Sequence, residues 1–181
     1  MLRNEGRDAN GTLQFTDIAM ATGADDIKDG RGMAVADFDN DGGLDIVINN
    51  NPGDSGDASK ARPTLLHNNT APRRNWLAVE LEGSNVDGKQ SNRDAVGATV
   101  TIETAGEKQL RLVSAGSGFA AQNSARLYFG LNDRTQIDAL TVRWPSGRVE
   151  RFERIGDKAI AARQLLRVKE GAGVTALPLP H

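Results

Sequence analysis

Four closely spaced aspartates form the part of this sequence best suited to chemistry. The segment 37–45 reads DFDNDGGLD, with carboxylates at its first, third, fifth and ninth positions: Asp37, Asp39, Asp41 and Asp45. Calcium takes about six to eight oxygen ligands in flexible geometry, and a tight loop can aim alternate side chains at one ion. Gly42 permits a sharp turn, so that the carbonyl of Gly43 can face the ion as well. The segment predicts a calcium site made by these five residues.

Other interpretations of the acidic segment are weaker. Mg²⁺ prefers fewer protein ligands in a rigid octahedron, and zinc is disfavoured because no His or Cys is near in the sequence. An EF-hand needs a glutamate at the twelfth loop position and flanking helices, whereas this chain has Ile48 there within an apolar run. A solvated acidic turn is the remaining alternative, but four clustered carboxylates repel one another without a cation.

The elements around this loop are expected to be strands. Apolar runs with little helical periodicity predict strands at 13–18, 33–38, 44–49 and 63–67, separated by the Asn10-Gly11 turn, the acidic loop and a polar excursion over 50–62. Thr70–Arg74 is the expected domain boundary. The first domain, residues 1–72, is then a calcium-loop hairpin with two further strands, and residues 73–170 form the second.

Residues 73–170 alternate apolar and polar positions more cleanly. Seven short strands are expected, near 77–81, 100–102, 110–112, 127–131, 140–144, 149–152 and 165–168. This pattern is typical of a small antiparallel β-sandwich or barrel. A helical turn is expected within 156–164, and a flexible tail over 171–181, which contains Pro178 and Pro180. Trp76 and Trp144 are expected to anchor the core rather than to form sugar platforms.

Composition excludes several classes of protein. The chain has 181 residues, no cysteine and a formal net charge of −2, with 16 Asp against 8 Glu. Disulfides and thiolate metal sites are therefore excluded, and nucleic acid is not expected as a partner. No apolar stretch is long enough to cross a membrane and no secretory signal precedes the first strand, so no membrane insertion is expected.

The strand–acidic loop–strand arrangement resembles the VCBS/FG-GAP repeat of integrin-like β-propellers. Three further segments match it: 10–18 (NGTLQFTDI), 32–37 (GMAVAD) and 65–69 (LLHNN). The resemblance covers about residues 1–70. It implies calcium bound by the same loop residues, Asp37, Asp39, Asp41, Gly43 and Asp45.

Residues 83–150 resemble the ASPIC/UnbV domain, which follows such repeats in the cartilage acidic protein-like family. The matching segments are 91–98 (SNRDAVGA), 116–124 (GSGFAAQNS), 129–131 (FGL) and 142–147 (VRWPSG). Within them, Asn92, Arg93 and Asp94 could form a loop held by local hydrogen bonds or a recognition patch. This resemblance implies the C-terminal fragment of a longer secreted protein, outside the cell, in the periplasm or at the cell surface.

Family propellers have several blades, whereas this chain has strands for about one. A single blade cannot bury both apolar faces alone. The expected fold is therefore all-β: one propeller-type blade packed on a small β-sandwich or barrel. The second blade face is expected to meet a partner copy, giving self-association, or the missing blades.

No enzymatic activity is expected. His67 and His181 are the only histidines, and His67 is interpreted as a structural or exposed strand residue rather than a base. No sequence motif of a serine hydrolase, P-loop or zinc protease is present. The expected function is a calcium-stabilised extracellular adhesion or recognition module with a protein or carbohydrate ligand. Two alternatives are a structural cap of a larger propeller and an accessory part of a polysaccharide-acting hydrolase or lyase.

Overall fold

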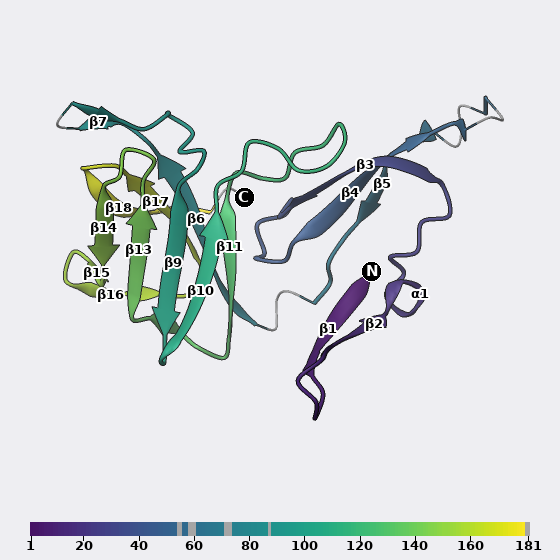
Figure 1. Ribbon diagram of the computed structural model, residues 1–181, viewed down its shortest axis with the longest axis horizontal. Helices are drawn as coiled ribbons and strands as arrows, with labels where there is room; N and C mark the ends of the chain where they lie inside the picture. Colours follow the sequence, from purple (N-terminus) through teal and green to yellow (C-terminus); the bar gives the residue numbers. More distant parts are fainter. Residues whose placement is uncertain (54–55, 58–60, 71–73, 87, 180–181) are drawn as a thin grey trace.

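The computed structural model describes residues 1–53, 56–57, 61–70, 74–86 and 88–179. The fold is all-β, as the sequence predicts, with one short helix, α1 (Ala19–Thr22), among these residues. Figure 1 shows two parts: a compact assembly of strands from Asn75 onward, and a more open part formed by the first 70 residues. Within the described chain, no helix has the length and apolar character needed to cross a lipid bilayer.

Two four-stranded sheets form the framework of the second part. One has the order β10-β9-β13-β14 and the other β11-β6-β17-β18. All neighbours are antiparallel except β6 and β17, which run parallel from Leu77↔Gln164 to Glu82↔Lys169. The strand bounds are β6 Asn75–Glu82, β9 Thr99–Thr104, β10 Glu107–Leu112, β11 Leu127–Asn132, β13 Ala139–Arg143, β14 Val149–Phe152, β17 Gln164–Lys169 and β18 Gly173–Leu177.

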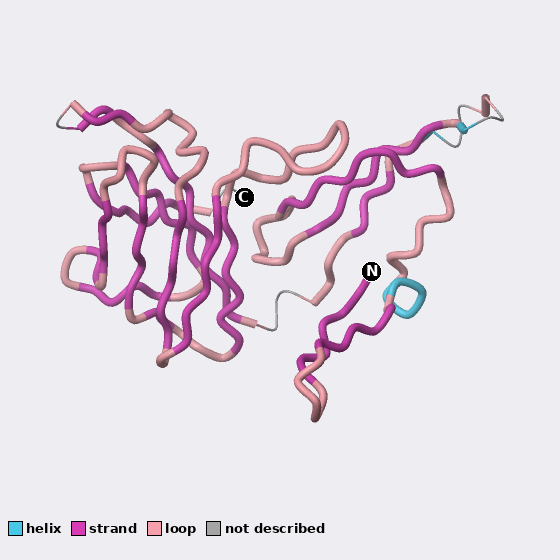
Figure 2. The backbone as a smooth tube through the Cα atoms, in the orientation of Figure 1, coloured by secondary structure: helices cyan, strands magenta, loops and turns pink. Residues whose placement is uncertain are grey.

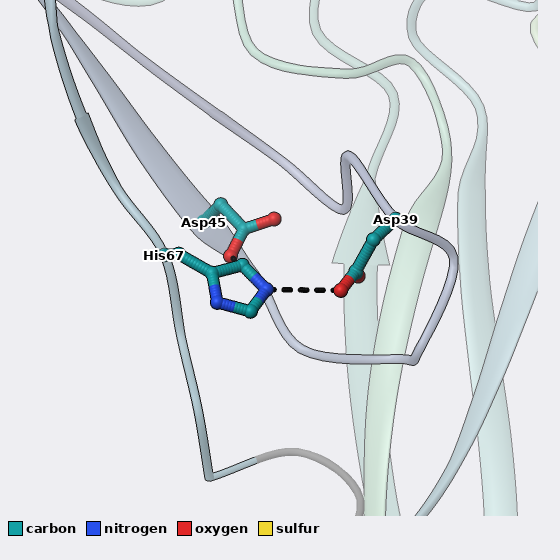
Figure 3. Close-up of side chains that lie close together, drawn as sticks. All are labelled: Asp39, Asp45 and His67. Atoms are coloured by element: carbon teal, nitrogen blue, oxygen red, sulfur yellow. Dashed lines mark hydrogen bonds and ion pairs between the residues drawn. The ribbon is translucent and has the colours of Figure 1, made fainter.

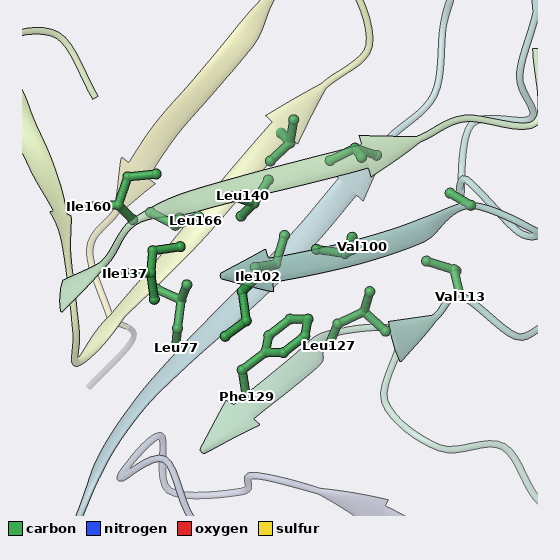
Figure 4. Packing of buried hydrophobic residues seen from close by; sticks show 14 of the residues in the cluster. Leu77, Val100, Ile102, Val113, Leu127, Phe129, Ile137, Leu140, Ile160 and Leu166 are labelled. Atoms are coloured by element: carbon green, nitrogen blue, oxygen red, sulfur yellow. The ribbon is translucent and has the colours of Figure 1, made fainter. Parts of the chain in front are cut away.

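The two sheets face each other across one apolar cluster (Figure 4). Val100 and Ile102 of β9 contact this cluster from one sheet, and Leu77, Phe129 and Leu166 contact it from the other. The period-two alternation of these strands places every second side chain in the cluster, as the sequence predicts. Trp144 lies in the same cluster and is 2% exposed, which confirms its role as a core anchor.

Two expectations for the end of the chain are wrong. The segment expected to be a helical turn contains β16 (Lys158–Ala161) instead, where Ile160 is fully buried. β16 pairs with β12 (Gln136–Ile137) on one side and with β15 (Arg154–Ile155) on the other, in a small sheet. The segment expected to be a flexible tail contains β18, which pairs with β17 from Leu165↔Leu177 to Lys169↔Gly173. Residues 180 and 181 lie outside the described residues. A further hairpin, β7 (Asn85–Val86) and β8 (Lys89–Gln90), completes the second part.

The first part contains two separate small sheets (Figure 2). β1 (Leu2–Arg7) and β2 (Leu13–Asp17) form a hairpin on either side of the Asn10-Gly11 turn. β3 (Asp29–Ala36), β4 (Asp45–Asn51) and β5 (Thr64–Leu66) form an antiparallel sheet in sequence order. The hairpin does not pair with the three-stranded sheet, so the described residues contain neither a four-stranded propeller blade nor a closed barrel. The expected boundary at Thr70–Arg74 falls largely on residues 71–73, outside the described residues.

The first part has very little core of its own. Among the described residues up to Thr70, every buried side chain is polar: Asp37, Asp45 and Asn50. Large apolar side chains are exposed instead, including Phe15 at 55%, Met33 at 53% and Leu65 at 57%. The second part supplies all of the buried apolar side chains described in the chain.

A long loop of the second part joins the two parts. The loop 113–126, between β10 and β11, runs toward the free edge of β3 (Figure 2). The Val35 N–H donates to Asn123 Oδ1 at 2.9 Å, and the Ser124 N–H donates to the Val35 carbonyl at 3.0 Å. These bonds satisfy backbone groups at an exposed sheet edge. Hydrogen bonds to the N–H and the carbonyl of Val35 therefore hold the acidic-loop hairpin against the second part.

Candidate functional site

The acidic loop connects β3 to β4. The register pair Ala36↔Asp45 closes it, so residues 37–44 must reverse the chain within a short span. Two residues have positive φ, Asn40 at 60° and Gly42 at 92°. Such values are natural for glycine and tolerated by asparagine, which explains their places in the loop.

Three of the predicted ligands converge. One carboxylate oxygen from each of Asp37, Asp39 and Asp41 lies within 4.8 Å of the other two. Loop N–H groups orient the three side chains: Gly42 donates to Asp37 Oδ2 at 3.1 Å, Asp41 to Asp39 Oδ1 at 3.2 Å, and Gly43 to Asp41 Oδ1 at 2.7 Å. The backbone thus holds three carboxylates together that would otherwise repel one another.

Asp37 is the most constrained of the three. The residue is 8% exposed, and its Oδ1 atom is buried with no hydrogen-bond partner among the described residues. Burial raises the pKa of this carboxyl, the Gly42 N–H lowers it, and the charges of Asp41 and Asp39 raise it again, with a net upward shift. An unpaired buried carboxylate oxygen beside two further carboxylates is a position where a cation would relieve the electrostatic cost.

Asp45 lies outside this group of three. It is 1% exposed, and backbone donors bond both of its oxygens: Phe38 N–H to Oδ2 at 3.0 Å and Asn68 N–H to Oδ1 at 2.7 Å. In this structure its carboxylate fixes the start of the loop and the segment after β5. Gly43, the fifth predicted ligand, is buried beside Asp41.

His67 belongs to the site, which the sequence did not reveal. Its Nε2 lies 2.9 Å from Asp39 Oδ2 and 4.0 Å from Asp45 Oδ1, and its Nδ1 lies 2.9 Å from Asn69 Oδ1 (Figure 3). The hydrogen bond that His67 donates to the Asp39 carboxylate raises the pKa of His67 and lowers the pKa of Asp39. Asp39, Asp45 and His67 form a second group that could hold a metal ion.

The premise that no histidine is near the loop is therefore wrong. The β4–β5 register explains the contact, because Ile46↔Leu66 places His67 beside Asp45. Aligning the two expected strands 44–49 and 63–67 as an antiparallel pair could have placed this histidine near Asp45. The spacing within the acidic segment alone could not.

The second part also contacts the loop directly. Arg126 Nη1 donates to Asn40 Oδ1 at 2.9 Å, and its Nε donates to Glu80 Oε1 at 2.7 Å. Trp76, 6% exposed, packs against the loop at Gly42. Loop geometry therefore depends on side chains of both parts.

The predicted recognition residues fall into two roles. Asn92 holds its own loop, because its Oδ1 accepts from the Val96 N–H and its Nδ2 donates to the Val96 carbonyl, both at 2.8 Å. Arg93 and Asp94 are exposed and line a pocket of about 690 Å³. Asn92 therefore fits the interpretation as part of a loop held by local hydrogen bonds. Arg93 and Asp94 remain candidates for a recognition patch.

Comparison with known proteins bears mainly on the second part. Residues 88–175 match the model of the family described as "ASPIC and UnbV". This match supports the resemblance of the second part to that domain. The resemblance of residues 1–70 to the FG-GAP repeat stays a prediction.

Three curated relatives share the name "Cartilage acidic protein 1". The Xenopus tropicalis protein is 30% identical over 125 residues, covering 67% of this chain, and the Mus musculus protein is 30% identical over 122 residues, covering 66%. The Homo sapiens protein is also 30% identical over 122 residues. The matched region spans only 16–17% of the length of these relatives.

Proposed function

We propose that this chain is a calcium-stabilised, non-catalytic extracellular binding module. The acidic loop binds Ca²⁺, and the ion fixes the hairpin β3–β4 against the second part. The ligand is a protein or a carbohydrate bound outside the cell; the module neither binds nucleic acid nor inserts into a membrane.

One observation carries the metal proposal: the buried, unpartnered Oδ1 of Asp37 beside the carboxylates of Asp39 and Asp41. All donors of this group are carboxylate oxygens, which favour a hard dication such as Ca²⁺. Asp37, Asp39 and Asp41 would hold the ion, with the Gly43 carbonyl as a further oxygen. Asp45 would contribute only by giving up one of its backbone hydrogen bonds or by accepting two partners on one oxygen.

Extracellular recognition is supported by the relatives, which are named for cartilage, and by the exposed pocket at Arg93 and Asp94. Calcium at the loop would stabilise the region that carries Asn40 and its contact with Arg126, which reaches the wall of that pocket. The ion would therefore act as a scaffold.

Thermal unfolding of metal-stripped protein tests the proposal. Calcium should stabilise the fold by about 2.7 kcal/mol at a hundredfold excess over Kd, and Mg²⁺ and Zn²⁺ should give smaller effects. Asp41→Ala should abolish the calcium-dependent rise in melting temperature, whereas Asp157→Ala, in the β15–β16 turn, should leave it unchanged. An unchanged calcium response in Asp41→Ala would reject the loop as the site.

A further inference from the structure

The pocket of about 690 Å³ lies on the second part, beside the metal loop but outside it. Its walls come from the end of β6, from β17, from the loop before β9 and from the segment 113–126. Its volume falls in the range of about 300–1,000 Å³ typical of small-molecule sites. Its lining includes charged side chains of both signs and one amide: Glu80, Glu82, Arg93, Asp94, Gln122, Arg126 and Arg167.

A net positive cluster forms one wall. Glu80 Oε1 accepts from Arg126 Nε at 2.7 Å, and Glu80 Oε2 accepts from Arg167 Nη2 at 3.0 Å. One carboxylate thus faces two guanidinium groups, which leaves one positive charge in excess. The neighbouring Glu82 pairs with Lys169 at 2.7 Å, and the positive charges of Arg167 and Arg93 also act on it. An anionic group would be attracted to this wall.

Arg93 and Asp94 are adjacent, exposed and lack side-chain hydrogen bonds among the described residues. Arg93 is close enough to Glu82 for their charges to interact, and its exposed guanidinium presents a planar set of N–H donors that matches a carboxylate. A free carboxylate accepts two hydroxyl hydrogens side by side, and Gln122 adds both a donor and an acceptor. The pocket therefore offers an anion position next to a hydroxyl position.

We propose that this pocket binds an acidic saccharide. The ligand carboxylate pairs with Arg93 beside the Arg126–Glu80–Arg167 cluster, and ligand hydroxyls bond Asp94 and Gln122. This inference rests on the proposed function as a binding module and names the class of its ligand. An acidic peptide fits less well, because successive carboxylates would approach Asp94 and Glu82, whereas a saccharide places hydroxyls between its charges.

The test uses the whole chain and a tetrasaccharide that contains two glucuronate residues. Its counterpart, with both carboxylates reduced to alcohols, is the matched ligand control. Titration followed by amide chemical shifts should locate the acidic ligand at residues around Arg93, Asp94 and Gln122. The reduced ligand should bind at least tenfold more weakly.

Two variants and a control assign the roles. Arg93→Gln should weaken binding of the acidic tetrasaccharide at least tenfold, and Asp94→Asn should weaken binding of both tetrasaccharides. Arg143→Gln, an exposed arginine on β13, should bind as the wild type does. Unchanged thermal unfolding of each variant would show that the fold is intact.

Three results would overturn the inference: no binding at millimolar acidic tetrasaccharide, equal binding of the carboxyl-reduced ligand, or binding of a tetraglutamate peptide instead. The calcium response is measured on the same samples. Saccharide binding without a calcium response would reject the metal proposal and keep the pocket assignment. A calcium response without saccharide binding would reject the pocket assignment alone.

Discussion

Gly42 of the acidic loop lies directly against the indole ring of Trp76. A Cβ atom built on Gly42 would fall 2.0 Å from two atoms of that ring, far inside van der Waals contact. Gly42 also has a φ of +92°, so both its backbone and its surroundings require glycine. This contact joins the candidate metal loop to β6, a central strand of the second part.

Replacing Gly42 by alanine should push the loop away from Trp76. We expect a loss of about 2–3 kcal/mol in the free energy of unfolding, because overpacking adds to backbone strain. Gly106→Ala is the matched control, since Gly106 has a φ of +83° but no atom within 4 Å of a built Cβ. Urea unfolding of both variants separates the cost of the clash with Trp76 from the cost of backbone strain. Equal losses in the free energy of unfolding would contradict the contact between Gly42 and Trp76.

A double-mutant cycle tests whether Trp76 causes the penalty. In a Trp76→Ala background the indole is absent, so Gly42→Ala should cost only its backbone strain, as Gly106→Ala does. The same measurement of unfolding free energy applies. A Gly42→Ala penalty that does not change in this background would place the clash elsewhere.

Replacing Asp37 by asparagine should have opposite effects with and without calcium. Asparagine can still accept the Gly42 N–H, but it removes a buried charge that faces Asp39 and Asp41. The metal-free variant should therefore be more stable than the wild type by about 0.5–1 kcal/mol at neutral pH, the scale of partly exposed charge interactions. Its calcium response should be much smaller.

Melting temperatures in chelator and in calcium measure both effects of Asp37→Asn. Asp94→Asn, an acid-to-amide change outside the metal loop, serves as the control and should alter neither the chelator value nor the calcium shift. A metal-free variant less stable than the wild type would mean that the Asp37 charge is stabilised by protein groups alone.

Ionisation of Glu103 should make the stability of the second part depend on pH. Hydrogen bonds from Arg151 and Lys108 lower the pKa of Glu103 to about 2 from its ordinary 4.5. A lowered carboxylate pKa stabilises the fold above the unfolded value and loses this contribution as the pH falls from 4.5 toward 2. The stability difference between wild type and Glu103→Gln should therefore be largest above pH 4.5 and shrink toward pH 2. Urea midpoints across this range would show it, and a difference independent of pH would contradict the ion pairs.

The exposed apolar side chains of the first part should promote self-association. Leu65 on β5 is 57% exposed, in a part where no described apolar side chain is fully buried. Sedimentation velocity should show concentration-dependent association that Leu65→Ser weakens. Leu110→Ser, at a 60% exposed leucine of β10, should have little effect. A monomer at all concentrations would indicate that the first part does not associate with another copy.

Strands buried on one face were the predictable part of the fold. Alternation located β9, β11 and β17, whose inward side chains Val100, Phe129 and Leu166 are fully buried. The helix-favouring residues of 156–164 were misleading, because burial of Ile160 outweighs local propensity. β18 was missed because a Pro-containing end suggests disorder, whereas its backbone bonds to β17 are visible only in three dimensions.

Only those residues of the candidate site that lie close together in the sequence could be predicted. The spacing of Asp37, Asp39 and Asp41 located three carboxylates that converge. The use of Asp45 by two backbone N–H groups and the approach of His67 depend on how β4 and β5 pair, which no local pattern specifies. The expected propeller-type blade is not found among the described residues, because no local pattern specifies whether the β1–β2 hairpin pairs with the three-stranded sheet.

An anomalous difference map from crystals grown in calcium would show whether the acidic loop binds the ion. We predict one strong peak between the carboxylates of Asp37, Asp39 and Asp41, with Asp37 Oδ1 among the nearest atoms. Full occupancy of that position by water alone, with the three carboxylates turned apart, would show that the loop does not bind calcium.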